Sequence, residues 1–425
     1  MDCEQPPASL AGGNLGPQPH VCAFFNSRDD EYRTLLPFVK EGLDRREKAI
    51  HIVDPVLRDE HLARMGGAGI AVDPALASRQ LEVLDWNETY LRGGCFDRRG
   101  MTARVEDMLS RARTEGFPRV RIVGHMDWAL HDGCDVGALV EYEARMNDVL
   151  PPHHDPALCA YDRSRFPASV AMDILRAHPV VVMEGVLQDN PAFLPAARLL
   201  ARLKRDALTL LRDRYLTALV VGARQEALEV GVEEALAEDV PAASVYLEVI
   251  QAAQYEVGRL WQARRLSVAQ EHLATEISRS AMGQLQPHLP FRRTNGKRAV
   301  VACVEGELHD LGARMVADFL EMAGFEVAYL GANVPDEHLA QLVRERRPDL
   351  VALSATTTSH APALRRAIGV VRAVEGSRIP IAAGGQLLVR KPDLGRRLGI
   401  DIQARDAGTL IAVLEQFFGE GSTLQ

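Results

Sequence analysis

The stretch Glu307-Leu308-His309-Asp310-Leu311-Gly312 joins an apolar run, Arg298–Val304, to a segment with helical periodicity. A strand, a short loop and a helix in this order place the loop at the carboxyl edge of a parallel sheet, where such sheets bind ligands. A neutral imidazole is a common metal ligand, and a carboxylate often orients its second nitrogen. We therefore predict that His309 is a ligand oriented by Glu307 or Asp310. The alternative is a histidine that only caps the helix.

The segment 297–420 continues as a series of short apolar runs separated by helical patterns, which predicts a doubly wound, Rossmann-like α/β domain. Gly312 allows close backbone approach at the start of the first helix. Ser354 and Thr356 follow the third run, and Gly384-Gly385 follows the fourth. Small residues at neighbouring strand ends predict a slot lined by hydroxyl donors. The expected strands are Arg298–Val304, Glu326–Leu330, Leu350–Ser354, Ile379–Ala383 and Asp401-Ile402.

Three motifs of this domain, Glu307-x-His309-x-x-Gly312, Ser354-x-Thr356 and Gly384-Gly385, resemble the cobalamin-binding domain of methionine synthase, corrinoid proteins and B12-dependent mutases. The resemblance implies that His309 replaces the dimethylbenzimidazole base as the lower axial ligand of cobalt. It also implies that Ser354, Thr356, Gly384 and Gly385 line the channel for the displaced nucleotide tail. The family usually has Asp where this chain has Glu307, and we expect the longer side chain still to orient His309.

Residues 191–290 contain no strand candidates and show nearly continuous helical periodicity, which predicts a four-helix bundle. Helix breaks are expected near Gly222, at Val240-Pro241 and at Ser267. The sequence Ser267-Val268-Ala269-Gln270 is typical of a capping box at a helix start.

Trp261 lies near the end of one predicted helix, and Glu271 and His272 lie in the first turns of the next, so all three fall at the same end of the bundle. A core indole and a charge at a helix N-terminus are the simpler interpretation. However, Trp-x9-Glu-His beside a cobalamin domain resembles the light-sensing cobalamin repressors of carotenoid genes. That resemblance implies that Trp261 covers the upper face of the cofactor while Glu271 and His272 contact an adenosyl group. Gln262 stands where those repressors can have a second cobalt ligand, a histidine.

The N-terminal part begins with residues 1–19, which are rich in Gly and Pro and are expected to be a disordered leader. Residues 20–190 alternate strands with helices and predict an α/β domain, and Gly185–Pro195 is expected to be a linker. The stretches Gly124–Trp128, Tyr161–Pro167, His178-Pro179 and Asn190-Pro191 resemble the MEDS sensory domain, which implies a RecA-like layout. A Gly-x4-Gly-Lys-Ser/Thr loop is absent from the sequence, so we expect no ATPase. We expect that His125, Asp127 and Trp128 either line a ligand pocket or pack together at the end of a strand. The expected strands are Val21–Phe25, Ala49–Val53, Leu81–Leu84, Val120–Val123, Leu158–Tyr161 and Val180–Met183.

The composition argues against several classes of protein and site. The chain has 425 residues, 47% hydrophobic residues and a formal net charge of -9, which argues against a basic DNA-binding face. The six cysteines contain no Cys-x-x-Cys pair, so we expect reduced thiols and no zinc site. Because no apolar stretch is long enough to span a membrane and no signal peptide is evident, we expect a cytoplasmic protein.

These patterns predict an adenosylcobalamin-binding light sensor rather than an enzyme. Photolysis of the cobalt–carbon bond would change domain packing and signal through the MEDS domain to an unknown regulatory partner of transcription, without direct DNA binding. Two alternatives remain: a corrinoid methyl carrier for a methyltransferase, and a non-photochemical sensor of cobalamin or redox state. A homo-oligomer is expected. A second chromophore such as a bilin could attach to one of four cysteines, unless these are simply small buried residues: Cys22, Cys95, Cys134 and Cys159.

Overall fold

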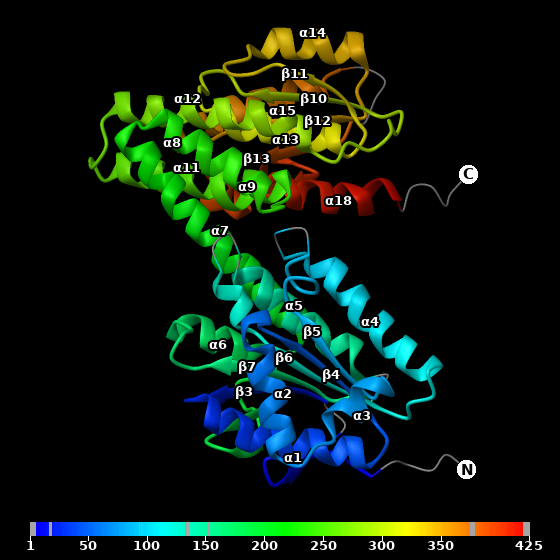
Figure 1. The fold of residues 1–425 in the computed structure, drawn as a ribbon. Helices are drawn as coiled ribbons and strands as arrows, with labels where there is room; N and C mark the ends of the chain where they lie inside the picture. Colours follow the sequence, from blue (N-terminus) through cyan, green and yellow to red (C-terminus); the bar gives the residue numbers. More distant parts are fainter. Residues whose placement is uncertain are drawn as a thin grey trace. The chain divides into compact units, whose positions relative to one another are not determined.

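The computed structural model describes residues 6–16, 19–92, 94, 96–131, 134, 136–151, 154–374 and 379–419. The chain forms two compact units, Met1–Arg205 and Asp206–Gln425, drawn in Figure 1. Helix α7 (Ala196–Val221) begins in the first unit and ends in the second. None of the helices in the described ranges is both long and apolar enough to cross a membrane. Cys95, one of the four expected chromophore positions, lies outside the described residues.

The first unit is built on a seven-stranded sheet in the order β5-β4-β6-β7-β3-β8-β9. All neighbouring strands are parallel except β8 and β9. The α/β prediction is therefore confirmed, and each of the six expected strands is present. The strands are β3 (His20–Phe25), β4 (Lys48–Val53), β5 (Leu81–Asp85), β6 (Val120–His125), β7 (Ala157–Asp162), β8 (Val180–Met183) and β9 (Val186–Asp189).

Helices cover both faces of this sheet, which explains why its inner strands are apolar along their whole length. One core contains Phe38 of α1 and Met65 of α2, and the other contains Leu109 of α4 and Leu139 of α5. Alternate residues of β3 and β7 therefore face α5. A buried cluster of four side chains lies at this face: His20, Glu143, Cys159 and His178. The helices are α1 (Arg28–Asp44), η1 (Pro55–Leu57), α2 (Arg58–Gly67), α3 (Val72–Ala77), α4 (Arg98–Thr114), η2 (Asp127–Leu130), α5 (Val136–Val149) and α6 (Ala168–Ala177).

Two segments differ from the sequence-based expectation. The expected linker holds β9, which pairs with β8 through a tight turn at Glu184 and Gly185, both at positive φ as such a turn requires. In the expected leader, β1 (Ser9–Leu10) pairs with β2 (Gly13–Asn14). Ala8, Leu10 and Leu15 are buried in the same core as Phe38, so apolar contacts anchor a segment whose composition suggests disorder.

The second unit contains a five-stranded parallel sheet in the order β11-β10-β12-β13-β14, as the Rossmann-like prediction requires. Its strands are β10 (Arg298–Cys303), β11 (Glu326–Tyr329), β12 (Leu350–Ser354), β13 (Ile381–Gly384) and β14 (Ile402–Gln403). Its helices are α13 (Leu311–Met322), α14 (Asp336–Arg346), η7 (Thr358–His360), α15 (Ala361–Arg372), α16 (Gln386–Arg390), α17 (Pro392–Leu398) and α18 (Ala407–Gly419).

The helical region of the second unit breaks where the sequence predicts. Its elements are the second half of α7, then α8 (Arg224–Leu228), η4 (Glu229–Glu234), α9 (Ala235–Ala237), α10 (Ala242–Ser244), η5 (Val245–Ile250), α11 (Gln251–Gln262), α12 (Val268–Leu285) and η6 (Gln286–His288). The capping box at Ser267 and Gln270 is present. The grouping of these helices as a four-helix bundle stays a prediction.

The helical region and the sheet of the second unit share one hydrophobic core. Tyr246 lies in this core, and its hydroxyl is 2.8 Å from the carbonyl oxygen of Met282 and 3.1 Å from Asp318 Oδ2 on α13. The helices are thus fixed against the sheet, so residues on both can build one site.

Candidate functional site

His309 lies in the loop after β10, and Glu307 holds its ring. Glu307 Oε1 accepts hydrogen bonds from the backbone N–H of His309 at 2.8 Å and from His309 Nδ1 at 2.6 Å. The Glu307 side chain is fully buried, whereas half of the His309 side chain is exposed. Because Nδ1 is engaged, Nε2 is the nitrogen that remains available to a metal.

The second oxygen of Glu307 reaches the loop after β12. It accepts a hydrogen bond from the Thr356 backbone N–H at 2.5 Å and lies 2.8 Å from His360 Nδ1. Burial acts to raise the pKa of Glu307, but the hydrogen bonds from His309 and Thr356 outweigh it and lower this pKa to about 2. The hydrogen bond with Glu307 raises the pKa of His309. His360 was not expected at the site, because nothing in its local sequence signals a contact with Glu307.

Asp310, the other candidate for orienting His309, has different partners. Its carboxylate accepts a hydrogen bond from Arg279 Nη2 of α12 at 2.7 Å and another from the Tyr329 hydroxyl at 3.0 Å. Burial acts to raise the pKa of Asp310, and the Arg279 guanidinium more than offsets it, so the pKa is lowered. Asp310 therefore ties the loop to α12, and Glu307 alone orients the imidazole.

A cavity opens beside this loop at the carboxyl ends of β12 and β13, with an empty volume of about 610 Å³ including its mouth. Gly312 borders it, and a Cβ built there meets no described atom within 4 Å, so this glycine leaves space in the cavity rather than permitting backbone contact. Gly385 differs, because its φ is +96° and a Cβ would lie 2.2 Å from the Ala355 carbonyl oxygen. The site residues that line the cavity are Gly312, Ser354, Gly384 and Gly385, together with Gln251 and Tyr255 of α11, which the sequence did not indicate.

Thr356 does not line this cavity in the described structure. Its backbone amide binds Glu307 instead. Thr356 thus helps to hold the carboxylate that orients His309, and the channel-lining role expected for it stays a prediction.

Trp261, Glu271 and His272 flank a tight reversal between α11 and α12. The backbone N–H of Arg264, at positive φ, donates to the Trp261 carbonyl oxygen at 2.8 Å and closes this turn. Trp261 is 40% exposed, so it is not a core residue. Glu271 accepts a hydrogen bond from His272 Nδ1 at 2.6 Å, and the His272 side chain is 73% exposed.

Two observations indicate that this reversal lies near the carboxyl edge of the sheet. Gln262 Oε1 accepts a hydrogen bond from Arg390 Nη2 of α16 at 3.3 Å. The negative charge of Glu271 contributes to the raised pKa of His309, although the Glu307 hydrogen bond is the larger cause. The exposed indole and imidazole therefore lie at the end of the helical region that borders the His309 loop.

The three candidate residues of the first unit, His125, Asp127 and Trp128, all have partners within that unit. Trp128 is fully buried and stacks on Tyr90 at a ring-centroid distance of 4.8 Å, which supports the packed strand end. Asp127 pairs with Arg165 at 2.6 Å, and His125 Nε2 lies 3.0 Å from Glu31 Oε1.

The cysteines of the first unit give little support to a covalently attached bilin. Cys22 and Cys159 are buried, and Cys134 is partly buried. Each of these three therefore fits the small buried residue that the sequence left as the alternative.

Comparison with known proteins assigns three segments. Residues 19–179 match the MEDS family, described as the methanogen/methylotroph, DcmR sensory domain. Residues 297–414 match a B12 binding domain, and residues 211–286 match a second B12 binding domain family. The chain thus combines a MEDS domain with B12-binding domains.

Relatives of two kinds match part of the chain. Dimethylamine corrinoid protein 1 of Methanosarcina acetivorans is 27% identical over 201 residues, which are 46% of this chain and 92% of that protein. The HTH-type transcriptional repressor CarH of Myxococcus xanthus is 29% identical over 162 residues, which are 38% of this chain and 54% of that protein. The solved monomethylamine corrinoid protein of Methanosarcina barkeri aligns with 49% of this chain and 99% of its own, at 22% identity and a TM-score of 0.45. The domain matches support corrinoid binding, and the relatives include both carriers and a regulator.

Proposed function

We propose that this protein is an adenosylcobalamin-dependent light sensor that signals through its MEDS domain. The observation that carries the proposal is the position of exposed Trp261 and the Glu271–His272 pair at the end of the helical region that borders the His309 loop. A methyl carrier has no evident need for this aromatic and acid–imidazole set, nor for a MEDS domain.

The residues present fit a corrinoid on both sides. On the lower side, His309 offers Nε2 and Glu307 fixes the ring. The cavity beside Gly312 and Gly385 is the place for a nucleotide tail, and no Cβ of residue 312 narrows it. On the upper side, Trp261 offers an indole face and His272 an exposed imidazole.

The bound cofactor would supply a light-labile cobalt–carbon bond, and the chain would supply the two-state element that reads its loss. Two polar contacts hold these helices on the sheet domain: Arg279 of α12 with Asp310, and Gln262 at the end of α11 with Arg390. We propose that Trp261 and His272 lose their packing partner when the upper ligand leaves, and that the helices then shift against these contacts. Because Gln262 offers no imidazole, no second histidine ligand from that position replaces the lost group.

Spectroscopy tests the proposal. The full chain is loaded with adenosylcobalamin in darkness, and its absorption spectrum is recorded before and after green light. We expect a stable dark spectrum and a permanent change on illumination. Trp261→Ala should release the adenosyl group faster in darkness, while Val268→Ala, a change at an exposed residue of the same reversal, should not. An unchanged spectrum after illumination would exclude the light sensor.

A methyl carrier is the second candidate, because a dimethylamine corrinoid protein matches over 92% of its own length. Here the chain loaded with methylcobalamin would pass its methyl group to a thiol or tetrahydrofolate acceptor when the cognate methyltransferase is present. Turnover of this kind, without a response to light, would favour the carrier. If oligomeric state depended on cobalamin but not on light, a non-photochemical sensor would be favoured.

A further inference from the structure

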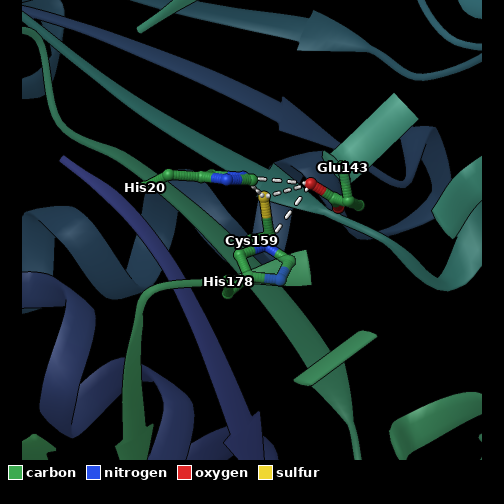
Figure 2. Close-up of side chains that lie close together, drawn as sticks. All are labelled: His20, Glu143, Cys159 and His178. Carbon is green, nitrogen blue, oxygen red and sulfur yellow. Dashed lines mark hydrogen bonds and ion pairs between the residues drawn. The ribbon is translucent and has the colours of Figure 1, made fainter. Parts of the chain in front are cut away.

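Four side chains converge in the first unit, away from any group used above. His20 opens β3, Glu143 lies on α5, Cys159 lies on β7 and His178 follows α6. Figure 2 shows all four pointing toward one another, and one ligand atom of each lies within 4.8 Å of the others. At most 7% of any of them is exposed, so bulk water does not solvate this polar group.

Hydrogen bonds on the outer side of the cluster fix the orientation of the rings. The Asn147 side-chain N–H groups donate to backbone carbonyl oxygens, among them that of Ala177 at 2.6 Å, so Asn147 Oδ1 faces His20 Nδ1 as an acceptor at 3.1 Å. His178 Nδ1 donates to the Ile174 carbonyl oxygen at 2.8 Å. In both rings Nδ1 must therefore carry the proton, which leaves Nε2 directed at the centre of the cluster.

The acidic partner is oriented in the same way. Glu143 Oε1 accepts a hydrogen bond from the Tyr161 hydroxyl at 2.5 Å, so Oε2 is the oxygen that faces inward. Oε2 lies 3.0 Å from His20 Nε2 and 3.3 Å from Cys159 Sγ. With neutral imidazoles, lone pairs of nitrogen and oxygen would face each other at hydrogen-bond distance with no proton between them. That arrangement is repulsive unless a proton or a metal cation lies between these atoms.

We propose that His20, Glu143, Cys159 and His178 bind one Zn²⁺ ion in a closed, structural site. Tetrahedral zinc with bonds of about 2.0–2.3 Å separates its ligand atoms by about 3.3–3.8 Å. The measured separations lie close to this range: 3.0 Å and 3.4 Å from Glu143 Oε2 to His20 Nε2 and His178 Nε2, and 3.5 Å from Cys159 Sγ to His20 Nε2.

Charge balance supports the same ion. A thiolate and a carboxylate together cancel the two positive charges of Zn²⁺, so the buried site carries no net charge. Without a metal, the Cys159 thiol donates to Glu143 Oε2 at 3.3 Å. Zinc binding deprotonates a coordinating thiol outright, so loading the site should release the Cys159 proton to solvent.

The types of the four ligands, and the absence of an open coordination position among them, indicate that the ion has a structural role. Two imidazoles, one thiolate and one carboxylate suit zinc better than the hard cations Mg²⁺ and Ca²⁺, which prefer oxygen ligands. Four protein ligands leave no position for a substrate. Such an ion would tie β3, which is more than 100 residues away in the chain, to α5, β7 and the turn before β8.

Metal analysis of the full-length protein tests this proposal independently of cobalamin, because zinc and cobalt are measured separately. After zinc loading and dialysis, the wild-type chain should hold about one zinc per chain, and Cys159→Ser should hold less than about 0.1. Cys303→Ser is the matched control, because Cys303 is also buried but belongs to the second unit. Wild-type protein that retains less than about 0.1 zinc, or Cys159→Ser that retains a full equivalent, would overturn the site.

X-ray absorption at the zinc edge of the wild-type protein covers the case in which Cys159→Ser does not fold. We expect one sulfur ligand at about 2.3 Å and nitrogen or oxygen ligands at about 2.0 Å. A shell without sulfur would place the zinc elsewhere and contradict the proposal. Removal of the ion by a strong chelator should also lower the melting temperature of the first unit, since a metal that binds only the folded state stabilises it.

Discussion

The two units each hold a histidine beside a glutamate, and the surroundings of the two pairs differ. In the second unit Glu307 is buried, half of the His309 side chain is exposed, and the His309 loop leads to Gly312, which lines a cavity. In the first unit His20 and Glu143 are both buried, and a second imidazole and a thiol complete the cluster. An open edge suits one axial bond to a large cofactor, whereas a closed cluster suits an ion that all four side chains surround.

Removing one imidazole from each unit, in separate variants, gives the sharpest test of this contrast. His309→Ala should weaken cobalamin binding by at least about 100-fold, the upper end of the cost of losing an outer partner of a metal ligand, and should return the spectrum to that of free cobalamin. Its zinc content should stay unchanged. His20→Ala should have the opposite profile, with zinc lost and the cobalamin spectrum retained. Loss of both metals in either variant would mean that the two sites are not independent.

The orienting carboxylate should matter less than the ligand itself. Glu307→Gln keeps the length of the side chain but removes its charge, so we expect cobalamin affinity to fall by roughly 10–100-fold. Equilibrium titration with cobalamin measures this change. Glu337→Gln, at an exposed position of α14, is the matched control and should bind cobalamin normally. An affinity equal to that of wild type would show that the ring of His309 needs no charged partner.

Substitutions at two glycines that line the cavity, Gly312 and Gly385, should affect protein stability and cobalamin binding differently. Gly385→Ala should lower the free energy of unfolding by roughly 1–3 kcal/mol, because φ is +96° and the new Cβ meets the Ala355 carbonyl oxygen. Gly312→Ala should leave stability unchanged or raise it, because the residue lies in a helix and its Cβ meets no described atom, yet it should weaken cobalamin binding. Denaturant unfolding and cobalamin titration of both variants are the measurements. Equal losses of stability would contradict the cavity geometry.

Acid should weaken the first unit through a different pair of histidines. Burial lowers the pKa of His51 to about 3 and that of His61 to about 2, with a smaller effect from nearby His125. The His61 ring is held between His51 and the Tyr32 hydroxyl, each at 2.8 Å. Both rings are thus neutral in the folded state, whereas in the unfolded state they bind protons below their ordinary pKa of 6.5.

The stability due to these rings is therefore complete above pH 6.5 and falls as the pH drops below it, by up to about 1.4 kcal/mol per pH unit for each ring. Denaturant unfolding of the first unit between pH 7.5 and about pH 5 measures the slope. His61→Gln should reduce it. A slope that is the same with and without His61 would show that other groups cause the acid sensitivity.

Much of the second unit was predictable because its signals are local in the sequence. The motif from Glu307 to Gly312, the capping box at Ser267 and the helix break at Gly222 each depend on a few neighbouring residues. The strands were predictable for the same reason, since an apolar run between turns is a local pattern. What could not be predicted there is which loop residues meet: His360 and Thr356 reach Glu307 from a loop about 50 residues further along the chain.

The sequence by itself indicated the order of the domains and the motif around His309 that predicts corrinoid binding, because both depend on contiguous patterns of residues. Only the tertiary structure decided which residues that are far apart in the sequence come into contact. The sequence predicted no zinc site because its cysteines are scattered, yet the fold brings Cys159 next to His20, 139 residues away, and next to Glu143, 16 residues away. Parallel pairing of β3 with β7 and the packing of α5 on their shared face create that cluster. Sheet register and helix packing depend on interactions along the whole chain, so no local spacing in the sequence could have shown it.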